Sequence, residues 1–91
     1  MIEKSASRRK RCLEITDEPD ELLFAEGYDA AILGIANIEG VDVMAYNSAK
    51  VISVLCRRDG MSRNEAEEFF DYNISSAHMG ERTPLFLRLL A

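Results

Sequence analysis

The order of hydrophobic and polar positions along this 91-residue chain predicts a strand hairpin followed by two helices. The apolar run 30–36 is rich in branched residues, which predicts a largely buried strand, and Gly34 within it indicates a bulge or a close neighbour. Residues 37–40 predict a tight hairpin loop, because they are few and include asparagine and glycine. In 41–46 successive residues alternate between two faces, which predicts a second strand with one face in water.

Two helices should follow this hairpin. Asn47 or Ser48 is suited to cap the first, and Asp59-Gly60 should end it. The second helix should start at the capping box 62–65, where a serine oxygen and a glutamate carboxylate satisfy backbone donors reciprocally. Residues at helical spacing predict its core face. They are Ala66, Phe69, Phe70, Asn73, Ile74 and Ala77.

The ends of the chain complete the expected fold. Residues 1–15 predict a basic helix or arm, and 18–27 predict one or two helical turns, because a proline and carboxylates stand at first-turn positions. A Thr-Pro pair predicts extended backbone before a third strand, 85–90. The expected class is therefore α+β, with a small three-stranded sheet in the order β-β-α-α-β. A helical hairpin should pack on one face, and residues 16–91 should form one domain.

Composition supports a folded domain and argues against a membrane protein. Apolar residues make up 47% of the chain and charged residues 30%, which is typical of globular proteins. The apolar runs are far shorter than the roughly 20 residues that a membrane-spanning helix needs. With no secretory signal at the start, we expect a cytoplasmic protein, in the host cytoplasm if the chain is encoded by a phage.

Charge is distributed unevenly around a net value of −5. Residues 1–12 carry five basic and one acidic side chain, 13–42 carry nine acidic and no basic ones, and 43–91 carry six of each. The basic cluster 8–11 could bind phosphates, or it could pair with the acidic run 14–21 in its own chain or in a second copy. Because no basic stripe continues elsewhere, we favour pairing with carboxylates over nucleic acid.

No spacing of reactive residues predicts catalysis, a cofactor or a metal. His78 is the single histidine, and Cys12 and Cys56 have no second cysteine or histidine at ligand spacing, so both are expected to be reduced thiols. Carboxylate pairs on the second helix have no neighbour that would separate their pKa values. The sequence therefore predicts neither an enzyme nor a cofactor site.

Residues 22–88 carry a recognisable pattern. It runs from Asp29-Ala30-Ala31-Ile32-Leu33-Gly34 through Ala45-Tyr46 and Lys50 to Arg58-Asp59-Gly60-Met61-Ser62, Glu65-Ala66, Phe69-Phe70, Asn73 and Gly80-Glu81-Arg82-Thr83-Pro84-Leu85-Phe86. This pattern resembles a group of small uncharacterised proteins of bacteriophages and bacteria. The resemblance implies a phage or prophage origin and no assigned activity. It also implies that Asn73, Gly80, Glu81, Thr83 and Pro84 form one local feature.

Two functional hypotheses follow. The first is a non-enzymatic interaction or regulatory protein, such as a phage-borne modulator of a host protein in the manner of an anti-defence factor. The second is an oligomeric binder of a nucleotide-like molecule. The acidic stretch from Glu14 to Asp42 and the lack of catalytic residues favour the first hypothesis. The second places the candidate binding surface in a pocket near Tyr72, Asn73, His78, Glu81 and Arg82.

The expected partners are a host protein or a second copy of the chain, and we predict a homodimer. Met44, Tyr46, Phe86 and Leu90 should form an apolar patch on the sheet face opposite the helices. A second copy could cover that patch. Alternatively, the N-terminal segment could fold over it within one chain, using Ile2, Leu13 and Ile15.

Overall fold

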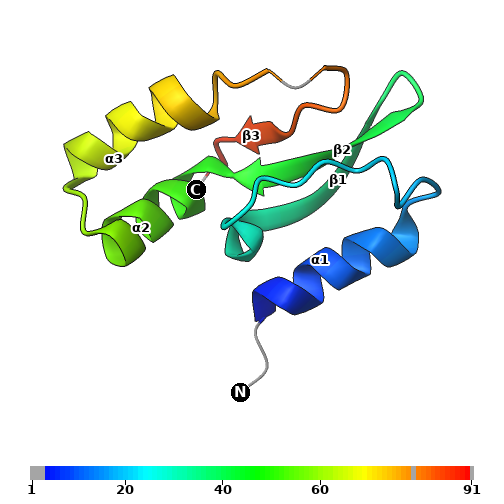
Figure 1. Ribbon diagram of the computed structural model, residues 1–91, viewed down its shortest axis with the longest axis horizontal. Helices are drawn as coiled ribbons and strands as arrows, with labels where there is room; N and C mark the ends of the chain where they lie inside the picture. The colour runs from blue at the N-terminus through cyan, green and yellow to red at the C-terminus, as the bar shows by residue number, and fades with distance from the viewer. Residues whose placement is uncertain (1–3, 79, 91) are drawn as a thin grey trace.

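The computed structural model describes residues 4–78 and 80–90, which form three α-helices and a three-stranded sheet (Figure 1). The elements follow in the order α1 (Lys4–Ile15), a short 3₁₀ helix η1 (Asp29–Ala31), β1 (Ile32–Ile38), β2 (Val41–Asn47), α2 (Ser48–Asp59), α3 (Arg63–Phe69), a π-helical turn η2 (Phe70–Ile74) and β3 (Leu85–Leu87). The predicted α+β class and β-β-α-α-β order are confirmed.

The sheet has β2 at its centre. β1 pairs with it antiparallel, and β3 pairs with it parallel on the other side. Glu39 and Gly40 join β1 to β2, and both have positive φ, as the tight turn of type I′ requires. The register shifts between Ile32 and Gly34, so the predicted bulge is present. The third strand ends at Leu87 rather than at residue 90.

The starts of both central helices follow the sequence signals. The Asn47 side chain accepts a hydrogen bond from the Lys50 amide and caps α2, and Gly60 ends that helix in the left-handed conformation. Ser62 and Glu65 form the predicted capping box at the start of α3. These local contacts set the boundaries of the helical hairpin, which lies at the end of the sheet where β2 enters α2 (Figure 1).

The core contains an aromatic stack that joins three elements. The Phe86 ring of β3 stacks on Tyr46 at 5.5 Å between centroids and meets Phe70 edge-on at 5.3 Å. Val51 and Leu55 of α2 are fully buried in the same cluster. The predicted meeting of the sheet, α2 and the second helix in one core is therefore confirmed, with one exception on α3.

That exception is Phe69, which was expected in the core and is 37% exposed. Asn73 is also exposed, whereas Ala66 and Phe70 are buried. The helix widens to π geometry after Phe69, with the Ser75 amide donating to the Phe70 carbonyl. A regular helix through residue 77 was therefore the wrong expectation, and the predicted core face is too wide by these two residues.

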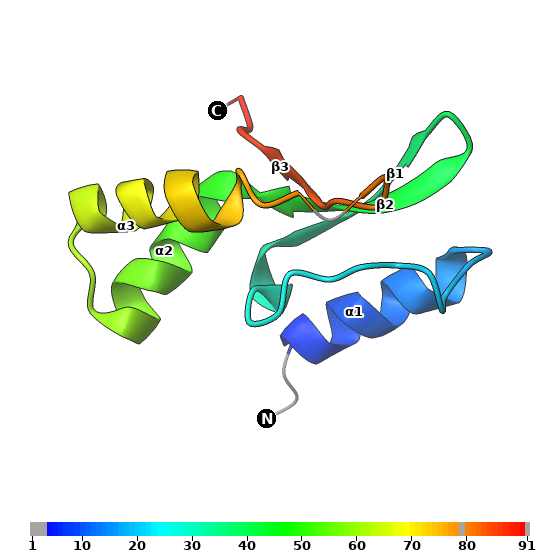
Figure 2. The same ribbon diagram turned by 45° about the horizontal axis from the view of Figure 1, so that its top comes forward.

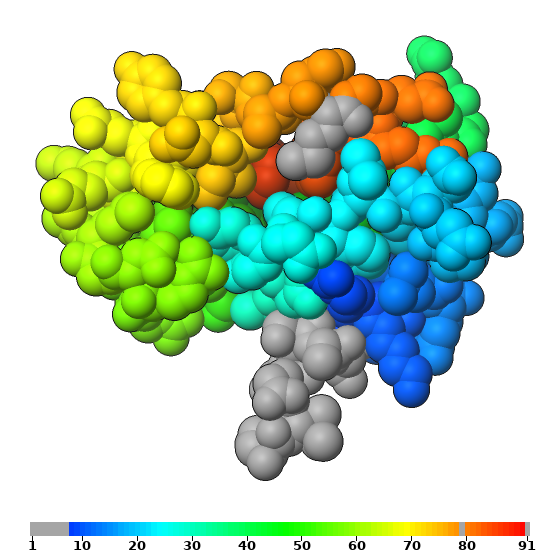
Figure 3. Space-filling view, in the orientation of Figure 1, coloured from blue at the N-terminus to red at the C-terminus, as the bar shows by residue number. Residues whose placement is uncertain are grey.

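Of the four residues predicted to form an open apolar patch on the sheet, only Leu90 is exposed. Met44 and Tyr46 are completely buried in one cluster with Val51, Leu55 and Phe70, so they lie on the face that the helices cover and not on the opposite one. Residues 16–28 also run over this side of the molecule (Figure 3), and the Ala25 amide donates to the Tyr46 hydroxyl. This segment contains turns and no α-helix, so the helical turns expected in 18–27 were wrong. The cover comes from the same chain, as in the lid alternative, which removes the patch as an argument for a dimer.

The N-terminal helix α1 belongs to the same packed unit and lies on one side of the sheet (Figure 2). Cys12 joins the core cluster, and Arg8 donates from its guanidinium to the Ile32 carbonyl at 2.8 Å. Leu13 and Ile15, expected to form the lid, are instead exposed, and Ile2 lies outside the described residues. Within the described ranges, no helix is both long and apolar enough to cross a membrane.

Candidate functional site

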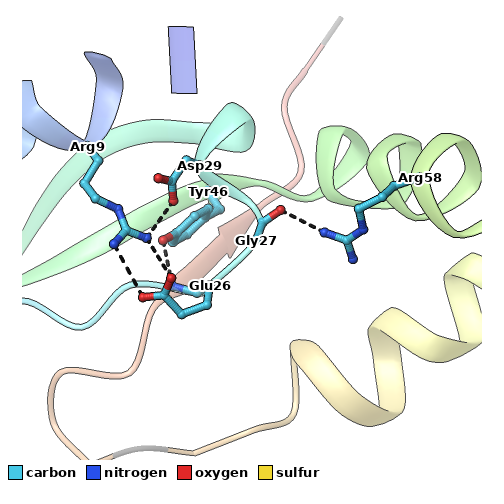
Figure 4. A network of polar contacts seen from close by, with 7 residues as sticks. Arg9, Glu26, Gly27, Asp29, Tyr46 and Arg58 are labelled. Carbon is cyan, nitrogen blue, oxygen red and sulfur yellow. Dashed lines mark hydrogen bonds and ion pairs between the residues drawn. The ribbon is translucent and has the colours of Figure 1, made fainter. Parts of the chain in front are cut away.

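The first polar cluster fixes residues 24–29 against α1, and Figure 4 shows it. The Arg9 guanidinium donates to Asp29 at 2.8 Å and to Glu26 at 3.3 Å, and it lies 4.3 Å from the centre of the Phe24 ring. The Asp29 carboxylate is the main reason that the pKa of Arg9 is raised. Arg9 therefore holds residues 24–29 against α1 through its contacts with two carboxylates and an aromatic ring.

Two further side chains hold the same segment from the other side. Arg58 of α2 donates to the Gly27 carbonyl at 3.0 Å (Figure 4). Its guanidinium also lies over the Tyr28 ring. The buried Tyr46 hydroxyl accepts from the Ala25 amide at 2.8 Å, and burial raises the pKa of Tyr46 to about 12. We call these contacts of Arg9, Tyr46 and Arg58 with residues 24–29 the polar clasp.

The polar clasp corrects the expected pairing of the basic cluster. Arg9 does bind carboxylates, but its partners are Glu26 and Asp29, which lie beyond the acidic run 14–21. Sequence spacing could not identify them, since they approach Arg9 only when residues 16–28 fold back along α1. With its guanidinium held by two carboxylates and an aromatic ring, Arg9 fits a structural role.

A second polar cluster surrounds Asp42 at the start of β2. Its carboxylate accepts from Asn37 at 2.8 Å and from the Thr16 hydroxyl at 2.7 Å, and these two bonds lower the pKa of Asp42. Arg82 approaches the Asp42 carbonyl at 3.4 Å and forms an ion pair with Glu18 at 2.8 Å. The cluster joins three distant segments of the chain.

The strongest candidate for a binding site is a shallow groove of about 420 Å³ along the outer side of α3. We call it the acidic aromatic groove. It is lined by Asp59, Gly60, Met61, Glu65, Glu68, Phe69, Tyr72 and Asn73. Tyr72 is 79% exposed and Phe69 is 37% exposed, so two aromatic rings of one helical stripe face solvent.

The spacing of residues along α3 and η2 explains why the groove is both aromatic and acidic. Glu65, Phe69 and Tyr72 recur at three or four residues, so they share a face that points away from buried Ala66 and Phe70. Three lining residues are acidic and none is basic. Asp59 is paired with Arg58 at 3.0 Å, and Glu65 accepts from the Ser62 amide. Glu68 is exposed beside the two rings.

The structure separates the candidate binding residues expected from sequence. Tyr72 and Asn73 both line the acidic aromatic groove, whereas His78, Glu81 and Arg82 do not. His78 and Glu81 are exposed on the connection to β3, and the helix ends before His78. Arg82 is turned toward Glu18, and its side chain is only 15% exposed. Sequence reasoning missed Phe69, which had been assigned to the core, and it did not identify Glu68 as a binding residue.

The feature implied by the phage-protein resemblance is divided in the same way. Thr83 donates from its hydroxyl and its amide to the Gly80 carbonyl, which forms a turn before β3. Asn73 and Pro84 line one small, mostly apolar cavity of about 160 Å³ with Phe86. Glu81 is exposed and lines neither hollow. A turn that leads the chain into β3 accounts for these contacts.

Reactive side chains form no further site in the part of the chain that the structure describes. No group of three or more histidines, cysteines or carboxylates could hold a metal ion there. Cys12 and Cys56 are unbridged, and burial raises the pKa of the Cys12 thiol, which disfavours the reactive thiolate.

Comparison with known protein families, with curated proteins and with solved structures found no match to this chain.

Proposed function

We propose that this chain is a protein-binding module that acts through the acidic aromatic groove and performs no chemistry of its own. The observation that carries the proposal is the exposure of Phe69 at the end of α3 and Tyr72 in η2, which line the same groove. Tyrosine and phenylalanine are enriched at protein interfaces, where their large surfaces are buried on binding. Exposed aromatic rings of this kind therefore support a role in recognition.

The lining of the groove favours a partner of defined chemistry. Glu65 and Glu68 place carboxylates next to the rings, while no lysine or arginine lines the groove. A lysine or arginine of a partner could pair with Glu68 and lie over an aromatic face. The partner surface should therefore combine cations with an aliphatic side chain. That partner would be a second copy of the chain, or a host protein if the chain has the phage origin that the resemblance implies.

The nucleotide-binding alternative draws less support from this arrangement. The groove that contains Tyr72 and Asn73 has three carboxylates, which would repel phosphate groups. Arg82, the cation of the predicted binding surface, forms an ion pair with Glu18 outside the groove. A polar small molecule would find no cation at this site.

Site-specific photocrosslinking tests the proposal. A photoreactive phenylalanine analogue would replace Tyr72 in the groove or, as a control, Ile38, which is 45% exposed on the strand hairpin. The full chain would be expressed in a bacterial host and irradiated. We expect a discrete crosslinked product from position 72 and not from position 38.

Charge reversal supplies the specificity control. Glu68→Arg should abolish the position 72 product, whereas Glu21→Arg, an exposed reversal outside the groove, should leave it unchanged. Products that are identical from both positions, or that persist in Glu68→Arg, would refute the groove as a binding site.

A further inference from the structure

The molecule has a second exposed surface whose chemistry is the reverse of the groove. Arg8, Arg11 and Ile15 of α1, with Leu33 of β1, line a hollow of about 270 Å³ beside the edge strand. Ile15 is 71% exposed and Leu33 is 43% exposed. We call these four residues the basic edge. The residues that line this hollow include two arginines and no carboxylate.

The basic edge cannot reach the acidic aromatic groove of its own chain. α1 and α3 lie on opposite sides of the molecule, with residues 16–31 and the sheet between them, in both ribbon views (Figures 1 and 2). Arg8 is also tied to β1 by its hydrogen bond to the Ile32 carbonyl. Any contact between the two surfaces must therefore form between separate copies.

We propose that the occupant of the acidic aromatic groove is the basic edge of a second copy of this chain. The inference rests on the proposed function, since it names the partner of that site. Arg11 would pair with Glu68 and lie against the Tyr72 ring, and Ile15 and Leu33 would cover Phe69 and Met61. Charge and apolar surface are then complementary on both sides of the contact.

The contact joins two different surfaces that lie on opposite sides of one molecule, so each copy makes it with two different neighbours. Such a head-to-tail contact forms a ring if the rotation between successive copies closes, and an open chain if it does not. The ion pairs predict that association weakens as the salt concentration rises.

Sedimentation equilibrium of the full chain, from micromolar to millimolar concentration, tests this contact. We expect concentration-dependent self-association of the natural chain. Glu68→Arg and Arg11→Glu should each weaken it at least about tenfold, because each places like charges in contact. Glu21→Arg and Lys50→Glu make the same changes of net charge at exposed positions outside both surfaces, and should leave it unchanged. Far-ultraviolet circular dichroism confirms that each variant is folded.

Mixing the two reversed chains gives the sharpest result. In a mixture, Glu68 of the Arg11→Glu copy can pair with Arg11 of the Glu68→Arg copy, as in the natural contact. The arginine at position 68 of one copy can also pair with the glutamate at position 11 of the other, which is the same contact with its charges reversed. Neither variant can make such a pair with itself. We therefore expect an equimolar mixture to recover association. A natural chain that remains monomeric throughout, or reversals that act like their controls, or a mixture that gains nothing, would overturn the inference.

The two proposals can fail separately. If the chain is monomeric but position 72 still crosslinks to another protein in a manner that requires Glu68, this inference is wrong and the proposed function stands. If association depends on Glu68 and Arg11 and position 72 crosslinks to the chain itself, this inference is supported. If neither occurs, both proposals are wrong.

Discussion

The helical hairpin and the segment 16–31 are held in place by different kinds of interaction. α2 and α3 are defined by local caps at Asn47 and Ser62 and by apolar side chains, such as Leu55, that face the core. Residues 16–31 contain turns and one short 3₁₀ helix, and Arg9, Tyr46 and Arg58 reach them from other elements. The helical hairpin is therefore specified largely by residues close in sequence, whereas the path of residues 16–31 depends on polar side chains that are distant in sequence.

The largest expected effect tests the apolar packing that holds the helical hairpin in the core. Phe70→Ala should lower the free energy of unfolding by about 3–5 kcal/mol, because it removes a ring that is buried against Phe86. Phe69→Ala, one position earlier and partly exposed, should cost less than about 1 kcal/mol. Urea denaturation of both variants measures the difference. Equal losses would contradict the assignment of Phe69 to the outer face.

Removal of one oxygen tests the polar side. Tyr46→Phe leaves the Ala25 amide without its acceptor, at an expected cost of about 1–3 kcal/mol. Hydrogen exchange at Ala25 should accelerate in this variant. Tyr72→Phe makes the same chemical change on an exposed ring and should alter neither quantity. Unchanged exchange at Ala25 would show that the hydroxyl does not hold this segment.

A smaller effect is expected at the start of α3. Ser62→Ala should cost about 1 kcal/mol, because the Glu65 amide loses its capping oxygen. Ser62→Asp keeps an acceptor at the same place and should retain most of the stability. Thermal melting compares the three chains. If alanine and aspartate behave alike, the helix begins at another residue.

The smallest effect concerns pH and the cluster around Asp42. Hydrogen bonds from Asn37 and Thr16 lower the pKa of Asp42 in the folded chain. Its stabilisation is therefore complete above the unfolded carboxyl pKa and is lost as the pH falls through the folded value. Asp42→Asn should have a lower melting temperature than the natural chain at about pH 7, and this difference in melting temperature should shrink toward about pH 3. Thr16→Val, which removes one of these hydrogen bonds, should raise the pKa of Asp42 measured by NMR. A difference in melting temperature between Asp42→Asn and the natural chain that does not depend on pH would contradict this account.

The fold could be predicted as far as neighbouring residues specify it. The capping box at Ser62, the stop at Gly60 and the hairpin turn before Val41 all depend on contacts within a few positions. The path of residues 16–28 could not be predicted, because it is fixed by bonds such as the one from Arg9 to Asp29, twenty positions away. Pro19 and its acidic neighbours are equally suited to a turn and to a first helical turn.

The candidate site was predicted only in part. Tyr72 and Asn73 were placed in a binding surface, and both line the groove. Arg82 was assigned to that surface because it is close in sequence, but its partner Glu18 comes from the other end of the chain. Phe69 was missed because an aromatic residue beside Phe70 matched an apolar face, and the change to π geometry after it leaves no simple mark in the sequence.

The parallel pairing of β3 with β2 has a consequence for synthesis of the chain. Tyr46 and Phe86 are neighbours in the sheet but forty residues apart in sequence. During synthesis, the strand hairpin and both helices leave the ribosome before β3 does. Until β3 has emerged, the Tyr46 and Phe70 rings lack the Phe86 ring that contacts both of them. The nascent chain should therefore complete its core only once β3 is available, and chaperone binding or proteolysis would act most strongly before that point.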